Sequence, residues 1–229
     1  MIEQWILDPA FAYLQPYFYN HPYALRLELG MGKSRRAFRK TAARRAREIH
    51  AILFPHGADA ILFNEWVTEW SDTGPAQETV DPHAREQMKR YLAAQRRSLA
   101  FLLEQQMRYR HATVRNLPTY DAEDDTVRRN RVVCYSDGRG FDDPALLDRA
   151  LRDRDNPEIG LVSFENDCIL SVYDDRGCDV VFASHEKLRA FYPLLEPYFL
   201  PYDLERMRAR YLSDEGKNGG EGTLSKQNR

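Results

Sequence analysis

The fold is decided by residues 169–183, Ile169-Leu-Ser-Val-Tyr-Asp-Asp-Arg-Gly-Cys-Asp-Val-Val-Phe-Ala183. Apolar residues recur at every second position on both sides of a central Asp-Asp-Arg-Gly segment, a period that is typical of half-buried strands. The pattern predicts a β-hairpin that turns over residues 174–177. We expect Asp174 to accept hydrogen bonds from the turn backbone, and Gly177 to adopt a positive φ, which glycine does without steric cost.

Other segments predict the strands that complete a sheet around this hairpin. Residues 159–164 precede it closely, so we expect the last three strands to form an antiparallel meander. Residues 24–29 alternate leucines with Arg26 and Glu28, which places the two charged residues on one face of an early strand. Further strands are predicted over residues 58–67 and 131–135. Residues 106–115 either end the preceding helix or form a polar edge strand, and we favour the strand.

Helices are predicted where a capping residue precedes apolar residues at three- and four-residue spacing. The longest begins after Ser34 and runs to about residue 54. Asp-Pro pairs at residues 8, 81 and 143 open three others, with the aspartate as the N-cap. Ser184 caps a later helix that we expect Pro193 and Pro197 to break, and a last short helix begins near residue 204.

Together these elements predict an α+β fold, with a mainly antiparallel sheet and helices packed chiefly on one of its faces. The chain has 229 residues, of which 43% are hydrophobic and 30% charged, and this suits one globular domain. We expect residues 1–212 to form that domain. Residues 213–229 are polar and lack an apolar run, which predicts a disordered tail.

Several classes of protein lack their signature here. The formal net charge of -2 argues against nucleic acid as the partner. No apolar run reaches the length of a membrane-spanning helix, and the N-terminus has no signal-peptide pattern. Cys134, Cys168 and Cys178 lack a C-x-x-C spacing, which indicates reduced, buried thiols in a cytoplasmic protein. The six histidines show no metal-ligand spacing and no nucleotide fingerprint is complete, so we expect neither a metal nor a cofactor.

One short segment has the residues of an anion site without the full motif. Gly32, Lys33 and Ser34 follow a predicted strand and open a helix, but the upstream glycine of a phosphate-binding Walker A loop is missing. At most, we expect the N–H groups of the helix start to bind an anion weakly.

Charged residues gather beside the hairpin and form a candidate functional cluster: Arg26, Glu28, Asp174, Asp175, Arg176 and Asp179. In an enzyme, paired carboxylates whose pKa values are separated by a neighbouring arginine act as acid and base. The alternative is turn chemistry, in which Asp174 satisfies the turn backbone and Arg176 points to solvent. We favour turn chemistry, because aspartate and glycine occupy turns for backbone reasons alone.

The long predicted helix has a strongly basic first half, with eight basic residues between residues 33 and 47 and no acidic one. The candidate partner-binding residues are Arg35, Arg36, Arg39, Lys40 and Arg44. These side chains either form a solvated face that pairs with acids elsewhere or bind an acidic protein or nucleic acid. We favour the solvated face, because the chain as a whole is slightly negative.

A set of short motifs resembles a known family. Leu25-Arg26-Leu27-Glu28-Leu29-Gly30, Ile52-Leu53-Phe54, Tyr173-Asp174-Asp175-Arg176-Gly177-Cys178-Asp179-Val180, Leu188-Arg189 and Tyr202-Asp203 occur in this order. The order resembles a bacterial domain of unknown function, the DUF3885 family, from about residue 23 to residue 210. The resemblance implies a soluble bacterial protein and specifies no activity. The aspartate-rich hairpin followed by a helix is also similar to several immunity proteins of bacterial polymorphic toxin systems, by analogy alone.

Three functions follow from these observations. The leading one is a non-enzymatic domain that binds a protein; a toxin-neutralising immunity protein, with a cognate toxin as partner, is one form of it. The second is an enzyme that uses Asp174, Asp175 and Arg176. The third is a nucleic-acid binder that uses the basic helix over residues 33–47. The sequence specifies neither the partner nor the oligomeric state.

Overall fold

The computed structural model describes residues 2–7, 17–68, 113–117, 127–135, 141–152 and 158–213. The helices predicted at residues 8 and 81, and the tail after Ser213, lie outside these ranges. Within them, the α+β class and the antiparallel sheet are confirmed.

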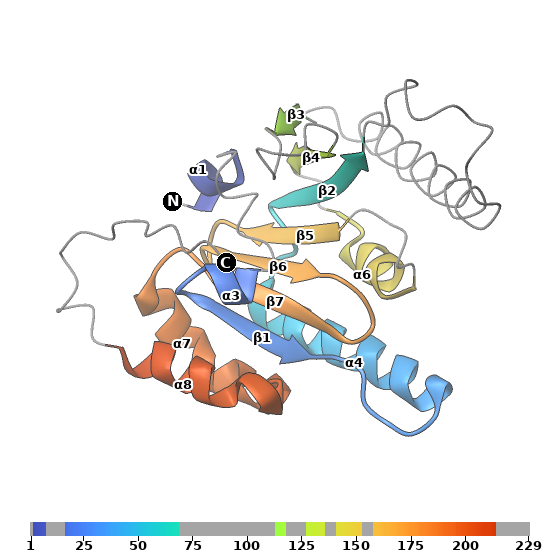
Figure 1. Ribbon diagram of the computed structural model, residues 1–229, viewed down its shortest axis with the longest axis vertical. Helices are drawn as coiled ribbons and strands as arrows, with labels where there is room; N and C mark the ends of the chain where they lie inside the picture. Colours follow the sequence, from blue (N-terminus) through green and yellow to red (C-terminus); the bar gives the residue numbers. More distant parts are fainter. Residues whose placement is uncertain are drawn as a thin grey trace, which may run out of the picture.

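The described residues form one antiparallel sheet of seven strands in the order β1-β7-β6-β5-β2-β4-β3 (Figure 1). The strands are β1 (Ala24–Glu28), β2 (Ala60–Thr68), β3 (Thr113–Leu117), β4 (Val127–Tyr135), β5 (Glu158–Ser163), β6 (Cys168–Val172) and β7 (Gly177–Phe182). Strands β5, β6 and β7 are the predicted antiparallel meander. Strand β1 pairs with β7, although more than 140 residues separate them in the chain.

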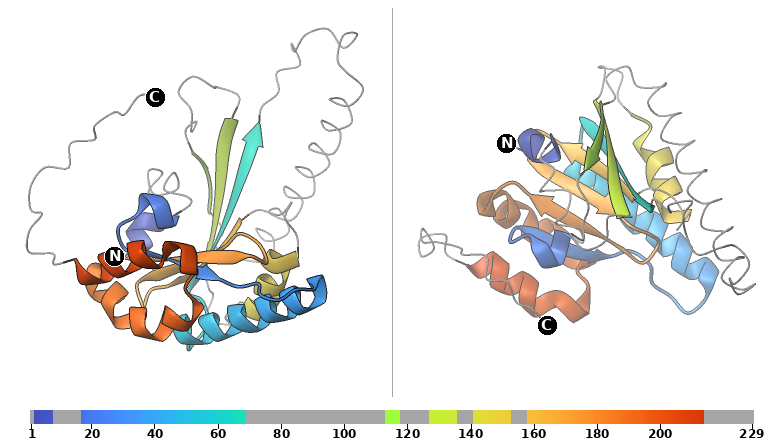
Figure 2. Two further views of the ribbon diagram at one scale, coloured as in Figure 1. Left: turned by 60° about the horizontal axis from the view of Figure 1, so that its bottom comes forward. Right: turned by 45° about the horizontal axis from the view of Figure 1, so that its top comes forward.

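Helices cover both faces of this sheet, and the larger ones share one face (Figure 2). The described helices are α1 (Ile2–Leu7), α3 (Tyr17–Asn20), α4 (Arg35–Leu53), α6 (Asp143–Arg152), α7 (His185–Leu195) and α8 (Leu204–Leu212), with 3-10 turns at Glu196–Tyr198 and Pro201–Asp203. Helices α4, α6 and α7 pack on one face, and the short α1 and α3 pack on the other. The predicted concentration of helices on one face is therefore correct.

The hairpin strands are more deeply buried than their alternating pattern predicts. Every residue of β6 and β7 is buried. Leu170 and Val180 face α4, α6 and α7, whereas Ile169 and Val181 face α1 and α3. The prediction of half-buried strands was wrong because these two short helices cover the second face.

Two predicted helix boundaries need correction. Asp142, not Asp143, caps α6: its Oδ1 atom accepts a hydrogen bond from the Ala145 N–H at 3.2 Å. Pro193 does not break α7, which continues to Leu195. A proline removes its own N–H donor and crowds the carbonyl four residues earlier, but α7 continues for only two residues beyond Pro193, where Leu195 is buried in the core.

The segments after α7 cover the free edge of β1. Leu27 forms an isolated bridge with Phe199, and the Leu200 N–H donates to the Arg26 carbonyl at 3.2 Å. From α8, the Arg210 guanidinium donates to the carbonyls of Ala24 and Phe18. These contacts satisfy edge groups that would otherwise be open to another chain, and they fix the strand that carries Arg26.

Candidate functional site

The hairpin turn uses the Asp174 carboxylate for its own backbone. The buried Asp174 accepts the Arg176 N–H through Oδ1 at 2.8 Å. Its Oδ2 accepts from Arg176 Nε at 2.7 Å, while the Arg176 side chain stays 67% exposed. These contacts raise the pKa of Arg176. The geometry is that of turn chemistry.

Gly177 is required by close packing and not by a positive φ. Among the described glycines, only Gly32 and Gly57 have a positive φ, so that part of the prediction was wrong. A Cβ atom at residue 177 would lie 2.5 Å from the Tyr173 hydroxyl and 2.7 Å from the Leu27 carbonyl oxygen. The tyrosine ring and strand β1 leave space only for hydrogen at this position.

Arg26 and Asp179 form an ion pair between the adjacent strands β1 and β7, where they stand opposite each other. Arg26 Nε lies 2.9 Å from Asp179 Oδ1, and Nη2 lies 3.2 Å from Oδ2. Oδ2 also accepts the Phe18 N–H of α3 at 3.0 Å. Asp179 is only 1% exposed, so a single carboxylate joins two strands and a helix in a site that water does not reach.

Aromatic rings surround the Arg26 guanidinium. Its carbon lies 4.4 Å from the ring centre of Tyr19, 5.2 Å from that of Phe18 and 5.7 Å from that of Tyr173. Burial alone would lower the pKa of Arg26, but the hydrogen bonds and charge of Asp179 outweigh it and raise that pKa. Burial and the neighbouring Asp179 also raise the pKa of Tyr173. These groups hold each other in place.

The six residues of the candidate cluster therefore do not converge on one point. Arg26 and Asp179 pair on the sheet, and Asp174 and Arg176 pair in the turn. Asp175 faces α4, with Oδ2 3.8 Å from Arg39 Nε. Glu28 forms no ion pair with any residue that the structure describes; its backbone carbonyl accepts from Arg45 Nε at 2.7 Å.

The five candidate partner-binding residues lie on the first half of α4 and are all exposed: Arg35, Arg36, Arg39, Lys40 and Arg44. We refer to these five residues as the basic surface. Arg44 pairs with Glu48 at 2.6 Å, and Arg39 Nε lies 3.8 Å from Asp175 Oδ2. The other three form no ion pair within the described ranges. The favoured interpretation, pairing with acids elsewhere, thus holds for part of this surface only.

Residues 4–203 of the chain match the family described as a domain of unknown function (DUF3885). The chain belongs to the DUF3885 family. The hairpin, the Arg26–Asp179 pair and the basic surface all lie within the matched DUF3885 region. Neither the curated proteins nor the solved structures gave a match, and nothing in the comparisons supports the likeness to immunity proteins.

A cavity of about 710 Å³ opens in the DUF3885 domain at the start of α4. Its walls come from the loop before α4, the first turn of that helix, the end of α6 and the hairpin turn. Arg152 of α6 is a wall residue that the sequence analysis missed. Almost 100 residues separate it from the end of α4, and no local pattern signals that the two helices pack together.

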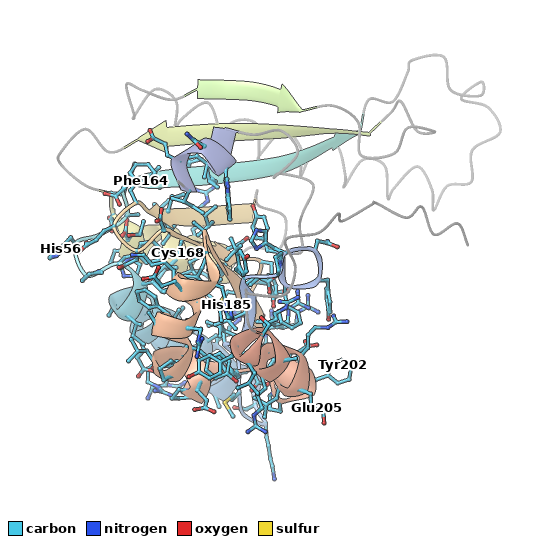
Figure 3. All side chains as sticks on the ribbon, turned by 90° about the vertical axis from the view of Figure 1, so that its left-hand side faces the viewer. His56, Phe164, Cys168, His185, Tyr202 and Glu205 are labelled. Atoms are coloured by element: carbon cyan, nitrogen blue, oxygen red, sulfur yellow. The ribbon has the colours of Figure 1, made fainter. Side chains whose placement is uncertain are left out.

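The described thiols and carboxylates offer no metal centre. No group of three His, Cys, Asp or Glu residues in the described ranges is arranged to hold a metal ion. Cys168 and Cys178 are buried and free, as predicted, and burial raises the pKa of both thiols. They lie at opposite ends of the hairpin, with Cys168 inside the core (Figure 3). None of the described helices has the length and apolar character to span a bilayer.

Proposed function

We propose that this DUF3885 protein is a non-enzymatic binding protein, and that an acidic partner protein docks on the basic surface. The observation that carries the proposal is the set of exposed cations on α4 that form no ion pair with a described residue. Arg36 and Lys40 form no ion pair with any described residue, and the single acidic residue of their helix, Glu48, already pairs with Arg44. Exposed charges of one sign attract a complementary surface and speed its association.

The carboxylates of the hairpin support binding over catalysis. Asp174 and Asp179 each bind their own arginine and a backbone N–H, so neither carboxylate is free to accept a proton from a substrate. An acid and a base in an enzyme need two groups that face one reacting molecule. The enzyme that uses Asp174, Asp175 and Arg176 is therefore the weaker alternative.

A toxin-neutralising immunity protein is one form of the proposed function. Such a protein blocks a toxin by covering its surface, and acidic residues on the toxin would face Arg36 and Lys40. We infer a cytoplasmic location, where reduced thiols such as those of Cys168 and Cys178 are usual. Nucleic acid is the competing partner for the same surface, and a salt titration separates the two.

The test is capture of the partner by the full chain, followed by charge reversal. Arg36→Glu together with Lys40→Glu should weaken binding of the captured protein at least about tenfold, because attraction becomes repulsion. The matched control is Arg189→Glu with Arg208→Glu, two exposed cations on α7 and α8. It makes the same change in net charge and should bind within about twofold of the unaltered protein. Equal losses in both variants would contradict docking on α4.

A further inference from the structure

We propose that the cavity at the start of α4 binds a small organic phosphate. Its volume of about 710 Å³ lies in the range of small-molecule sites. Three parts of the chain that are distant in sequence meet there: residues 32–39, the end of α6 and the hairpin turn. Figures 1 and 2 show the start of α4 and α6 at the same end of the sheet.

The described residues of the cavity wall carry a positive net charge. They include five cations and a single carboxylate, that of Asp175; the cations are Lys33, Arg35, Arg39, Arg152 and Arg176. They come from the helix start, from α6 and from the turn, so they reach one space from several directions. A phosphate group offers oxygens to several donors at once, and arginine forks match its geometry.

Two of these cations are already held in position. Arg176 Nη2 lies 2.6 Å from Asp174 Oδ2, and Arg152 Nη2 lies 3.4 Å from Asp148 Oδ2. Each guanidinium has five N–H donors, so these contacts leave donors for a ligand. Lys33 forms no ion pair with a described residue. Pre-positioned donors lose less freedom on binding than mobile ones.

The loop before α4 is fixed by packing. A Cβ at residue 30 would lie 2.1 Å from the Phe38 ring and 2.5 Å from the Asp175 carbonyl oxygen, so the loop lies against the hairpin turn. Gly32 has a φ of +120°. The first turn of α4 contains no acidic residue, so the positive end of the helix dipole adds to the cations.

The remaining wall residues set the class of ligand. Phe38 and Leu151 contribute apolar surface beside the cations. Inorganic phosphate would leave that surface uncovered, whereas the organic part of a phosphate ester would cover it. The proposal goes beyond docking of a protein, because it depends on Arg152 and Arg176, which are not part of the basic surface.

Calorimetric titration of the full chain with ATP, pyrophosphate and adenosine tests the site. ATP should bind saturably at about 100 mM salt, pyrophosphate more weakly, and adenosine should not bind. Arg152→Gln with Arg176→Gln should weaken ATP binding about tenfold or more. Arg36→Gln with Arg44→Gln removes the same charge from α4 outside the cavity wall, and it should leave the affinity within about twofold.

A substitution that should strengthen ATP binding distinguishes loss of the site from misfolding of the variant. Asp175→Asn removes the only carboxylate among the described wall residues and should tighten ATP binding by about two- to fivefold, a gain that unfolding does not produce. Absence of saturable ATP binding, equal losses in the two arginine pairs, or weaker binding by Asp175→Asn would each overturn the proposal. If ATP binds but no protein partner is captured, the proposed protein-binding function is refuted and the phosphate site stands.

Discussion

Asp179 of β7 accepts two hydrogen bonds from Arg26 of β1, and water reaches only 1% of the aspartate. The same carboxylate accepts the N–H of Phe18. Removal of a charge from water is unfavourable, and a buried pair offsets that term only when its geometry is good and its remaining lone pairs are satisfied. Both conditions hold here, so the pair fixes the β1–β7 register and the position of α3.

Removal of one partner should therefore lower the free energy of unfolding more than removal of both. Arg26→Met leaves the Asp179 charge buried without its partner, and we expect a loss of about 3–5 kcal/mol in the free energy of unfolding. Arg26→Met with Asp179→Leu leaves no buried charge and should lose less than Arg26→Met alone. Urea unfolding of the unaltered protein, the two single variants and the double variant measures the difference. Additive losses from the single substitutions would contradict the coupling of the two residues.

Gly177 should tolerate no side chain. Gly177→Ala places a methyl group against the Tyr173 hydroxyl and the Leu27 carbonyl, at 2.5 Å and 2.7 Å before relaxation. Overpacking of this kind lowers stability by about 1–3 kcal/mol. Thermal melts measure the change. Tyr173→Phe removes the hydroxyl, so the same alanine should cost less in that background; an equal cost in both would contradict this explanation.

Local chemistry made the hairpin predictable. The period of two placed β6 and β7 correctly, and Asp174 accepts the backbone N–H expected from turn chemistry. The cap at Ser34 was likewise predictable, because a cap depends on residues within one turn of the helix. Each of these features is determined by contacts between residues close in sequence.

Contacts across the chain were not predictable in the same way. Arg26 and Asp179 were both candidate residues, but their pairing depends on β1 lying beside β7, and no local pattern specifies that strand order. The requirement for Gly177 comes from Leu27, 150 residues away. Arg152 joins the cavity only because α6 packs against α4. A single sequence carries no signal for such neighbours.

His21 should make stability depend on pH. Burial, with a smaller effect of Arg210, lowers the pKa of His21 from 6.5 to about 4. Between these values the unfolded chain binds a proton and the folded protein does not, so stability is full above pH 6.5 and falls as pH decreases toward 4. The shift corresponds to a loss of up to about 3 kcal/mol.

The measurement is the urea midpoint at pH 7.5 and at pH 5. His21→Asn keeps an acceptor close to Nδ1, which accepts the Tyr23 N–H, but it does not titrate. The fall in midpoint between the two pH values should therefore shrink in this variant. His56→Asn, at an exposed position, should retain the full fall. If His21→Asn and the unaltered protein lose the same stability, the pH dependence arises elsewhere.

Nucleic acid should not bind the basic surface tightly. Lys and Arg side chains that neutralise phosphates release counterions, so affinity for DNA or RNA falls steeply with salt. We expect no binding tighter than about micromolar at physiological salt, which is the non-specific range. Titration of labelled DNA and RNA at two salt concentrations measures this. The control variant carries Glu at Arg35, Arg36, Arg39, Lys40 and Arg44. Tight binding that falls with salt and is lost in this variant would make nucleic acid the partner of the basic surface.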